Sequence, residues 1–342
     1  MKNYPAVDML DTENEYLIKT MISSEQVKNF LNNCLKGTKV EGFPETYIGK
    51  VRDNYVTADG RRILVTTDRQ SAFDRNLGLI PLKGQALTQL SSWWFEQTKD
   101  IVRNHVIEVP DPNIVVGKNV KGIPIEMVIR GYLTGSTGTS SWTAYSKGER
   151  LYCGHKLPEG MKKNDAFEKP LITPTSKSDS HDENLDFYTI PQSGLVRPEL
   201  WEQMVTATYA LFERGRELAR RGGLILVDTK YEFGEDNEGK LILIDEIHTS
   251  DSSRFWKADT FEERIAAGQE PDNFDKEFLR LWFKDRCDPY KDEVLPEMPD
   301  DFRVDVAMRY IETYERITGK DFILPEGDVT RRVEAVLKGL AG

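Results

Sequence analysis

Two apolar runs joined by a turn and followed by charged side chains constrain this chain more than any other feature. Residues 224–227 are apolar and lead into Asp228, Lys230 and Glu232 at alternate positions. Alternate residues of a β-strand share one face, so these three side chains are expected to line up on one side. Turn-forming residues at 234–239 and a second apolar run at 241–244 predict a β-hairpin that brings in Asp245.

Asp245 shares that face in hairpin registers that set residue 228 or 230 opposite residue 245. Three carboxylates around one lysine repel one another unless a divalent cation or a phosphate completes the set. That pattern is expected of a magnesium–nucleotide site. A solvated polar face with an ordinary salt bridge is the alternative interpretation, and the hairpin alone favours neither.

Composition sets the broad class of protein. A chain of 342 residues can form a large core and predicts two domains or lobes. The net charge of -11 argues against a bulk nucleic-acid binder, although a small phosphorylated substrate needs only a local basic pocket. No apolar run has the length of a membrane span, and the N-terminus shows no secretion signal. Cys34, Cys153 and Cys287 are odd in number and far apart, which predicts a reducing cytoplasm and neither disulfides nor a zinc site.

Periodicity divides the chain into three parts. Residues 1–40 are expected to form an acidic leader and a helix at 24–34. Residues 41–124 are rich in β-branched segments and predict a β-rich lobe with one helix at 83–99. Residues 125–342 predict a mixed α/β lobe. Its helices are expected at 198–221, which stops at Gly222-Gly223, and at 276–287, 299–319 and 329–340.

Several short motifs suggest ligand contacts when they are taken together. The motif GKVRD at 49–53 sits in a strand segment, with a glycine that lets the backbone approach a ligand, but no Walker A or G-x-G-x-x-G pattern occurs. The segment TDRQSAFD at 67–74 follows a strand end, where turn chemistry and a helix cap are the alternative interpretation. Arg130 and Arg254 each adjoin a hydroxyl-rich loop, a combination that can grip a phosphate.

These motifs occur in an order that resembles the SAICAR synthetase family (phosphoribosylaminoimidazole-succinocarboxamide synthase) of purine biosynthesis. The resemblance covers residues 47–256 and looks like the longer, yeast-like form. It rests on GKVRD at 49–53, TDRQSAFD at 67–74, EMVIRGYLTGS at 126–136, TPTSK at 173–177, DTKYEFG at 228–234, and DE at 245–246 through SRFW at 253–256.

The resemblance implies an α+β fold of two lobes, kinase-like or ATP-grasp-like, with ATP between a β-rich N-terminal lobe and an α/β lobe that binds substrate and metal. The resemblance implies an ATP-dependent carbon–nitrogen ligase that joins carboxyaminoimidazole ribotide (CAIR) to L-aspartate, and the reaction is expected to pass through an acyl phosphate. ATP and Mg²⁺ are the implied cofactors, and neither nucleic acid nor a membrane is an implied partner. The sequence gives no oligomeric state.

The resemblance also implies roles for particular residues. Asp228 and Lys230 would sit at the reacting centre, and Glu232 and Asp245 would hold Mg²⁺. The remaining residues fall into an ATP-binding group, with the backbone of 126–128 facing the adenine, and a substrate-binding group. The first group is Gly49, Lys50, Val51, Arg52, Glu126, Met127 and Val128. The second is Ser71, Asp74, Arg130, Ser136, Lys177 and Arg254, with His181 as a further lid contact beside Lys177.

Two rival functions remain open at this point. A small-molecule kinase of related fold would share the magnesium–ATP residues and lack the grip on a ribotide phosphate from Arg130, Ser136 and Arg254. A non-catalytic nucleotide-binding module would be expected to have lost Lys50, Asp228, Lys230 or Asp245, and all four are present.

Overall fold

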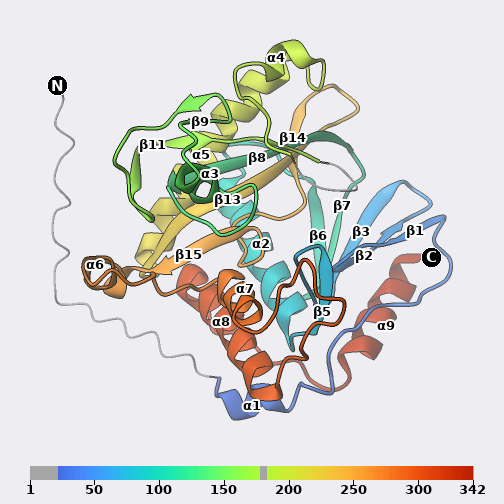
Figure 1. The fold of residues 1–342 in the computed structure, drawn as a ribbon. Coiled ribbons are helices and arrows are strands. Elements are labelled where there is room, and N and C mark those ends of the chain that lie inside the picture. The colour runs from blue at the N-terminus through green and yellow to red at the C-terminus, as the bar shows by residue number, and fades with distance from the viewer. Residues whose placement is uncertain (1–21, 178–182, 342) are drawn as a thin grey trace.

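The computed structural model describes residues 22–177 and 183–341, so His181 and most of the acidic leader lie outside the described residues. A five-stranded antiparallel sheet and a six-stranded antiparallel sheet dominate the fold (Figure 1). In spatial order, the smaller sheet contains β1 (Glu45–Ile48), β2 (Arg52–Val56), β3 (Arg61–Thr66), β7 (Ile114–Lys118) and β6 (Val106–Asp111).

The larger sheet is built around its two longest strands, which pair with each other along most of their length. Their register sets Asp228 opposite Arg130 and Glu232 opposite Glu126. The sheet contains β11 (Ala166–Ile172), β8 (Lys121–Tyr132), β13 (Leu224–Glu235) and β14 (Leu241–Ile244), with β12 (Thr175–Ser176) on β8 and β15 (Ser253–Lys257) on β13. Two small hairpins, β4 (Arg69–Ala72) with β5 (Arg75–Leu79) and β9 (Leu151–Tyr152) with β10 (His155–Lys156), complete the strands described.

The long helices cover the sheets and agree closely with the predicted spans. The helix Pro198–Arg221 ends at Gly222, as predicted. The helix Asp300–Thr318 ends at Gly319, whose left-handed φ of +67° is one that glycine adopts freely. The helices are α1 (Ser24–Lys28), α2 (Lys83–Thr98), α3 (Ser141–Ser146), α4 (Ile190–Ser193), α5 (Pro198–Arg221), α6 (Ala258–Ala266), α7 (Glu277–Lys284), α8 (Asp300–Thr318) and α9 (Val329–Ala341).

The helix predicted at 24–34 is shorter than expected because Asn33 is used elsewhere. Its amide nitrogen donates to the Gly327 carbonyl at 2.7 Å, and its oxygen accepts from the Val329 N–H at 3.1 Å. Asn33 thus satisfies a free backbone donor at the start of α9, the last helix of the chain. The local sequence favours helix, but this contact across nearly 300 positions turns the chain instead.

The lobes differ from the expected division at residue 124. The chain crosses from the smaller sheet to the larger one between Lys118 and Lys121, because β8 already belongs to the larger sheet. Helix α9 returns to the smaller lobe, where Val333 and Leu337 pack against Ile63 and the other inward residues of that sheet. The apolar residues of helix α2 belong to the main core, where α2 packs beside α8, and α2 also contacts β3 and β6 of the smaller sheet. Sequence order therefore does not match the lobes at either end of the chain.

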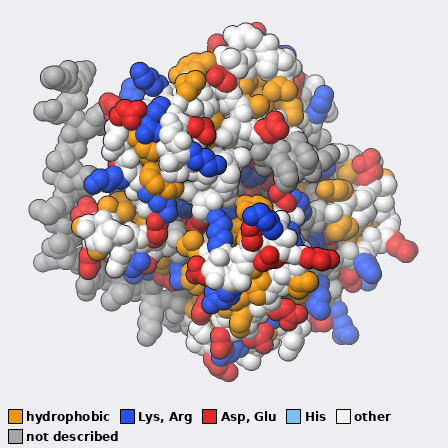
Figure 2. Space-filling view, viewed as in Figure 1, with side chains coloured by type: hydrophobic (Ala, Val, Ile, Leu, Met, Phe, Trp, Pro, Cys, Tyr) orange, Lys and Arg blue, Asp and Glu red, His pale blue; other side chains and the backbone are white. Residues whose placement is uncertain are grey.

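Among the described residues, no helix combines the length and apolar character needed to cross a bilayer. Figure 2 shows acidic and basic side chains intermixed over the visible face, with apolar side chains in small scattered patches. Such a surface gives no large apolar area on this face that would require a covering partner.

Two buried histidines make the stability of this fold depend on pH. The His248 ring lies within hydrogen-bond range of the Tyr231 hydroxyl and the Leu211 carbonyl, and burial lowers its pKa to about 3. Burial likewise lowers the pKa of His105 to about 4. An unfolded histidine titrates near about 6.5, so below that pH the unfolded chain binds protons that the folded chain does not.

We therefore expect the free energy of unfolding to fall as the pH drops from about 6.5 toward 4, by about 1.4 kcal/mol per pH unit for each histidine. Urea unfolding at a series of pH values measures this slope. His248→Gln should reduce the slope by the share of one histidine, whatever it costs in overall stability. An unchanged slope in this variant would contradict the assignment.

Candidate active site

The predicted alternation along β13 is present, and it faces a matching row on β8. Asp228, Lys230 and Glu232 stand opposite Arg130, Val128 and Glu126. Directly opposed carboxylates repel, so the Glu126–Glu232 pair needs a cation between its members. Lys230 supplies it: its Nζ lies 2.5 Å from Glu126 Oε1 and 3.3 Å from Glu232 Oε1.

The surrounding carboxylates fix the charge of Lys230. Burial opposes the ammonium form, but Glu232, Glu126 and Asp245 together outweigh it and raise the pKa of Lys230 above its ordinary value. Glu232 also accepts a hydrogen bond from Lys177, the last described residue before the gap at 178–182. Burial, and then repulsion from Asp245, raises the pKa of Glu232. Lys230 is therefore a fixed cation in this site.

Asp245 reaches the site by a route that differs from the predicted one. The hairpin pairs Glu232 with Ile244, so a continued strand would set residue 245 opposite Tyr231, whose side chain is buried on the other face. The expected registers, with 228 or 230 opposite 245, are therefore wrong. The strand ends at Ile244, and Asp245 adopts a left-handed backbone conformation with φ +66°. This turn carries its carboxylate to Arg52, whose Nη1 lies 2.5 Å from Asp245 Oδ1.

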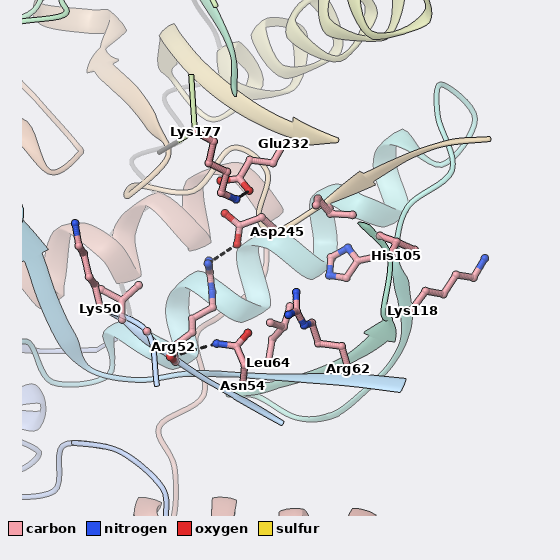
Figure 3. A pocket seen from close by; sticks show the side chains of 14 residues that line it. Lys50, Arg52, Asn54, Arg62, Leu64, His105, Lys118, Lys177, Glu232 and Asp245 are labelled. Atoms are coloured by element: carbon pink, nitrogen blue, oxygen red, sulfur yellow. Dashed lines mark hydrogen bonds and ion pairs between the residues drawn. The ribbon is translucent and has the colours of Figure 1, made fainter. Parts of the chain in front are cut away.

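A cavity of about 240 Å³ lies between the smaller sheet and the end of the β13–β14 hairpin. Figure 3 shows Lys50 at one end of it, His105 and Lys118 at the other, and Arg52 pointing to Asp245 below Lys177 and Glu232. Its lining joins the GKVRD segment to the two predicted metal ligands. The lining residues are Gly49, Lys50, Val51, Arg52, Asn54, Arg62, Leu64, His105, Lys118, Val120, Lys177, Glu232, Ile244 and Asp245.

The GKVRD segment forms a tight turn between two strands, whereas the sequence suggested that it lies within one strand. Strand β1 ends at Ile48 and β2 begins at Arg52, so residues 49–51 make the turn while Arg52 and Asp53 lie in β2, and the Gly49 N–H donates to the Arg52 carbonyl at 2.8 Å. Lys50 at the tip lies 2.7 Å from Asp74 and is mostly exposed. The turn therefore presents backbone and a lysine to the cavity.

Arg69 holds this turn in place. Its guanidinium donates to the carbonyls of Gly49 at 2.9 Å and Lys50 at 3.2 Å, and it pairs with the buried carboxylate of Asp53 at 2.7 Å. A further bond reaches the Lys36 carbonyl at 2.8 Å. Bonds from a planar fork to several carbonyls suit arginine and are beyond the reach of a lysine ammonium.

A second cavity, of about 290 Å³, lies along the larger sheet beyond Lys230. Its lining combines the arginines predicted to hold a phosphate with a group of charged residues from three other segments. These residues are Glu126, Val128, Arg130, Thr139, Asp228, Thr229, Lys230, Asp251, Ser252, Ser253, Arg254, Asp275, Lys276 and Arg280. Lys230 lines this cavity while its partner Glu232 lines the first, so this ion pair stands between the two cavities.

Two arginines of the second cavity, Arg130 and Arg254, share one carboxylate. Arg254 forms a close ion pair with Asp228, and Arg130 Nη1 lies 3.5 Å from the same oxygen. Arg254 also lies 3.7 Å from Glu277, which accepts a hydrogen bond from the Ser136 hydroxyl. Ser136 is therefore linked to Arg254 by way of Glu277, and it is not one of the residues that line the cavity.

Three other predicted contacts are placed differently. The backbone of 126–128 is paired with β13 on one side and bonded to residues 173–175 on the other, so it has no free edge to offer an adenine as a hinge. The side chain of Met127 is buried in the core. Ser71 and Asp74 lie on or beside the β4–β5 hairpin and line neither of the two cavities.

The sequence argument missed several residues that the fold brings to the second cavity. Asp251 Oδ2 lies 3.0 Å from Lys83 Nζ and 3.4 Å from Lys276 Nζ, and Asp251 Oδ1 accepts from the Tyr310 hydroxyl at 2.5 Å. These residues come from α2, the loop after β14, the start of α7 and α8. In the sequence, the hydroxyl-rich loop at 250–253 indicates a ligand contact only through the adjoining Arg254, and Lys83 has no sequence signal.

Comparison with known proteins places the chain in a family. The model of the family described as SAICAR synthetase matches residues 45–297. The phosphoribosylaminoimidazole-succinocarboxamide synthase of Legionella pneumophila strain Paris is 54% identical over 290 residues, which cover 85% of this chain and 92% of that protein. The chain therefore belongs to the SAICAR synthetase family, as its motifs predicted.

Solved structures agree on the fold. The SAICAR synthase of Saccharomyces cerevisiae complexed with SAICAR matches with a TM-score of 0.72 and 32% identity, covering 85% of this chain and all of that one. A type-2 SAICAR synthetase in complex with ADP matches with a TM-score of 0.62 and 24% identity, over 82% of this chain and all of that one. The predicted α+β, SAICAR synthase-like fold is confirmed, and so is the assignment to the ligases of purine biosynthesis.

The contacts of Arg69 predict that the GKVRD turn loosens when this guanidinium is lost. In Arg69→Lys, hydrogen exchange at the Gly49 amide should accelerate about tenfold or more, because each lost bond to a charged donor is worth about 1.5–3 kcal/mol. Arg75→Lys is the matched control, since Arg75 also donates to two carbonyls, those of Asp292 and Glu293, away from the cavity. Equal acceleration at Gly49 in both variants would show that Arg69 does not hold the turn.

Proposed function

We propose that this chain carries out the ligation of its family with the two cavities as its ATP and ribotide sites. The reaction joins the carboxylate of CAIR to the amino group of L-aspartate and gives SAICAR, ADP and phosphate. One observation supports this placement above all: the Lys230–Glu232 pair stands between a cavity lined by a glycine turn with carboxylates and a cavity where Arg130 and Arg254 flank one carboxylate.

The chemistry explains why two adjoining sites are needed. A carboxylate is a poor acyl donor, so it must first receive the γ-phosphoryl group of ATP and become an acyl phosphate. The phosphoryl donor and the acceptor carboxylate must then meet end to end in a site that excludes water. Lys230, which stays charged and stands beside Glu232 at the boundary of the two cavities, would lie where negative charge develops between them.

The first cavity suits ATP. Its apolar lining, Leu64, Val120 and Ile244, would take the base, while the GKVRD turn with Lys50 would take the phosphates. In the present arrangement Arg52 pairs with Asp245, and Lys177 with Glu232. A triphosphate would give these cations new partners.

The carboxylates of Glu232 and Asp245 fit a magnesium ion. Burial, and then repulsion from Asp245, raises the pKa of Glu232, so a cation between the two would relieve that repulsion, and hard oxygen ligands are those that Mg²⁺ prefers. When bound, Mg²⁺ would neutralise the triphosphate. Glu232 and Asp245 would supply its protein ligands.

The second cavity suits the ribotide. Arg254 and Arg130 flank Asp228, and an incoming phosphate can replace this carboxylate as their partner by bidentate hydrogen bonds. Ser136 and Glu277 would hold Arg254 in position from behind. A kinase acting on a simple hydroxyl acceptor has no need for this arginine pair, so the site favours the ligase over that alternative. We place the reaction in the cytoplasm, as the three dispersed cysteines suggest.

Purified protein should release ADP and phosphate in a ribotide-dependent way and form the amide product only when L-aspartate is present. Coupled measurement of ADP together with chromatography of the product tests this. Efficient transfer of phosphate to a hydroxyl acceptor, without amide formation, would reassign the site to the kinase alternative.

Asp245→Asn should remove nearly all turnover and weaken binding of magnesium–ATP, because an amide is a poorer ligand for a hard cation than a carboxylate. Lys230→Met should lower kcat far more than it changes either nucleotide KM, since its charge is needed most in the transition state. Steady-state kinetics on the folded variants measures both effects.

Glu235→Gln is the matched control for these two variants. Glu235 lies further along β13 and pairs with the exposed Arg197, and an exposed pair contributes only about 0–1 kcal/mol of stability. It should leave kcat unchanged. A near-normal kcat in folded Asp245→Asn and Lys230→Met would rule out the proposed reacting centre.

A further inference from the structure

A buried group at the wall of the second cavity carries more positive than negative charge. It consists of Asp251, Lys276 and Lys83. Asp251 uses one oxygen, Oδ2, to contact both Lys83 at 3.0 Å and Lys276 at 3.4 Å. Its other oxygen, Oδ1, accepts a hydrogen bond from the Tyr310 hydroxyl. One carboxylate therefore serves two lysines, and one positive charge is left without a counterion of its own.

The two lysines differ in their access to the cavity. Lys83 is fully buried and lines neither cavity, whereas Lys276, just before α7, retains 13% of its side-chain exposure and lines the second cavity. The charged groups facing Lys276 are Asp251 and Glu246 from the loop after β14, Lys83 from α2 and Arg280 from α7. Burial, aided by Lys83 and Arg280 and opposed by Asp251, lowers the pKa of Lys276 to about 8.

The proposed function requires a base at this cavity. L-Aspartate arrives as an ammonium ion, whose nitrogen has no lone pair to attack an acyl phosphate. A group in contact with the amine must first remove a proton, and a pKa near the working pH suits that task. We propose that Lys276, as the uncharged amine, is the base that accepts this proton from the α-ammonium group of L-aspartate. This proposal rests on the proposed function.

The step balances as follows. One proton passes from the aspartate nitrogen to Lys276 Nζ, where the new ammonium faces the carboxylate of Asp251. The freed lone pair forms the C–N bond to the acyl carbon, and the bond from that carbon to the phosphate oxygen breaks. Phosphate leaves with the electron pair and takes up the second proton of the amine, and Lys276 later releases its proton to solvent.

The other candidates in this cavity are less suited. The pKa of Lys230 is raised, so it stays charged. Burial opposes the charge of Asp251, but Lys276 and Lys83 hold its pKa below the ordinary value, which makes it a weak base. Burial raises the pKa of Asp275 to about 7, yet its two oxygens accept the main-chain N–H groups of Phe255 at 2.9 Å and Glu277 at 2.6 Å. Asp275 is therefore committed to holding the backbone.

Two variants separate a base from a simple binding charge. Lys276→Arg keeps a cation that can hold an anion but does not lose its proton, and Lys276→Met removes the nitrogen. With L-aspartate as the nucleophile, kcat should fall about 10²–10⁴-fold in both variants. With hydroxylamine, which is uncharged at neutral pH and needs no base, ribotide- and ATP-dependent hydroxamate formation should stay within about threefold of wild type.

The pH profile gives a second readout. Wild-type kcat should rise with pH and level off above about 8, as Lys276 loses its proton. In Lys276→Arg it should go on rising, because only aspartate already deprotonated in solution can react. Lys291→Arg, at an exposed lysine paired with Asp288, is the control and should behave as wild type.

Near-normal kcat with L-aspartate in Lys276→Arg would overturn the proposal, because a cation alone would then suffice. Loss of hydroxamate formation in that variant would overturn it as well, by placing Lys276 in the phosphoryl-transfer step. Failure of the wild-type protein to form hydroxamate from ATP and the ribotide would instead count against the proposed function, separately from Lys276.

Discussion

The pairing of Lys230 with Glu126 and Glu232 is the interaction on which the site depends. Two carboxylates face each other across β8 and β13, and without the ammonium between them their burial would cost several kcal/mol. Two other carboxylates nearby are neutralised in the same way: Arg52 forms an ion pair with Asp245, and Arg254 forms one with Asp228. The charges that we propose to bind ligands thus satisfy one another in the free protein, which lets a strongly charged site remain folded.

This arrangement also determines how ligands enter. A phosphate that approaches Arg254 competes with a carboxylate already in place, so binding exchanges one charged partner for another and does not create a new contact from two solvated groups. The gain in free energy is then smaller than the contacts alone suggest, and it depends on how well the displaced Asp228 is stabilised elsewhere. Arg130, within 3.5 Å of the same oxygen, would undergo the same exchange of partners.

Much of this site could be predicted from sequence because a strand has a period of two. That period alone placed Asp228, Lys230 and Glu232 on one face, and the long helices followed from their caps and stops. The position of Asp245 could not be obtained this way, since it depends on a hairpin register and on a left-handed residue that no periodicity encodes. The contacts of Asp251 with Lys83, Lys276 and Tyr310 could not be predicted for another reason. These residues are far apart in the sequence and meet only after the tertiary fold has formed.

Lys230 and Lys276 show how the pKa of one side-chain type can shift in opposite directions in a single cavity. Both are buried, and burial by itself disfavours the charge of each. Lys230 has Glu126, Glu232 and Asp245 around it, so attraction exceeds the desolvation cost and the ammonium persists. Lys276 shares Asp251 with Lys83 and meets the repulsion of Arg280, so desolvation prevails. The number of carboxylates per lysine, which is set by the register of two strands and by the packing of α2 against α8, thus sets the direction of each pKa shift, and the lowered pKa of Lys276 is the one that the proposed base requires.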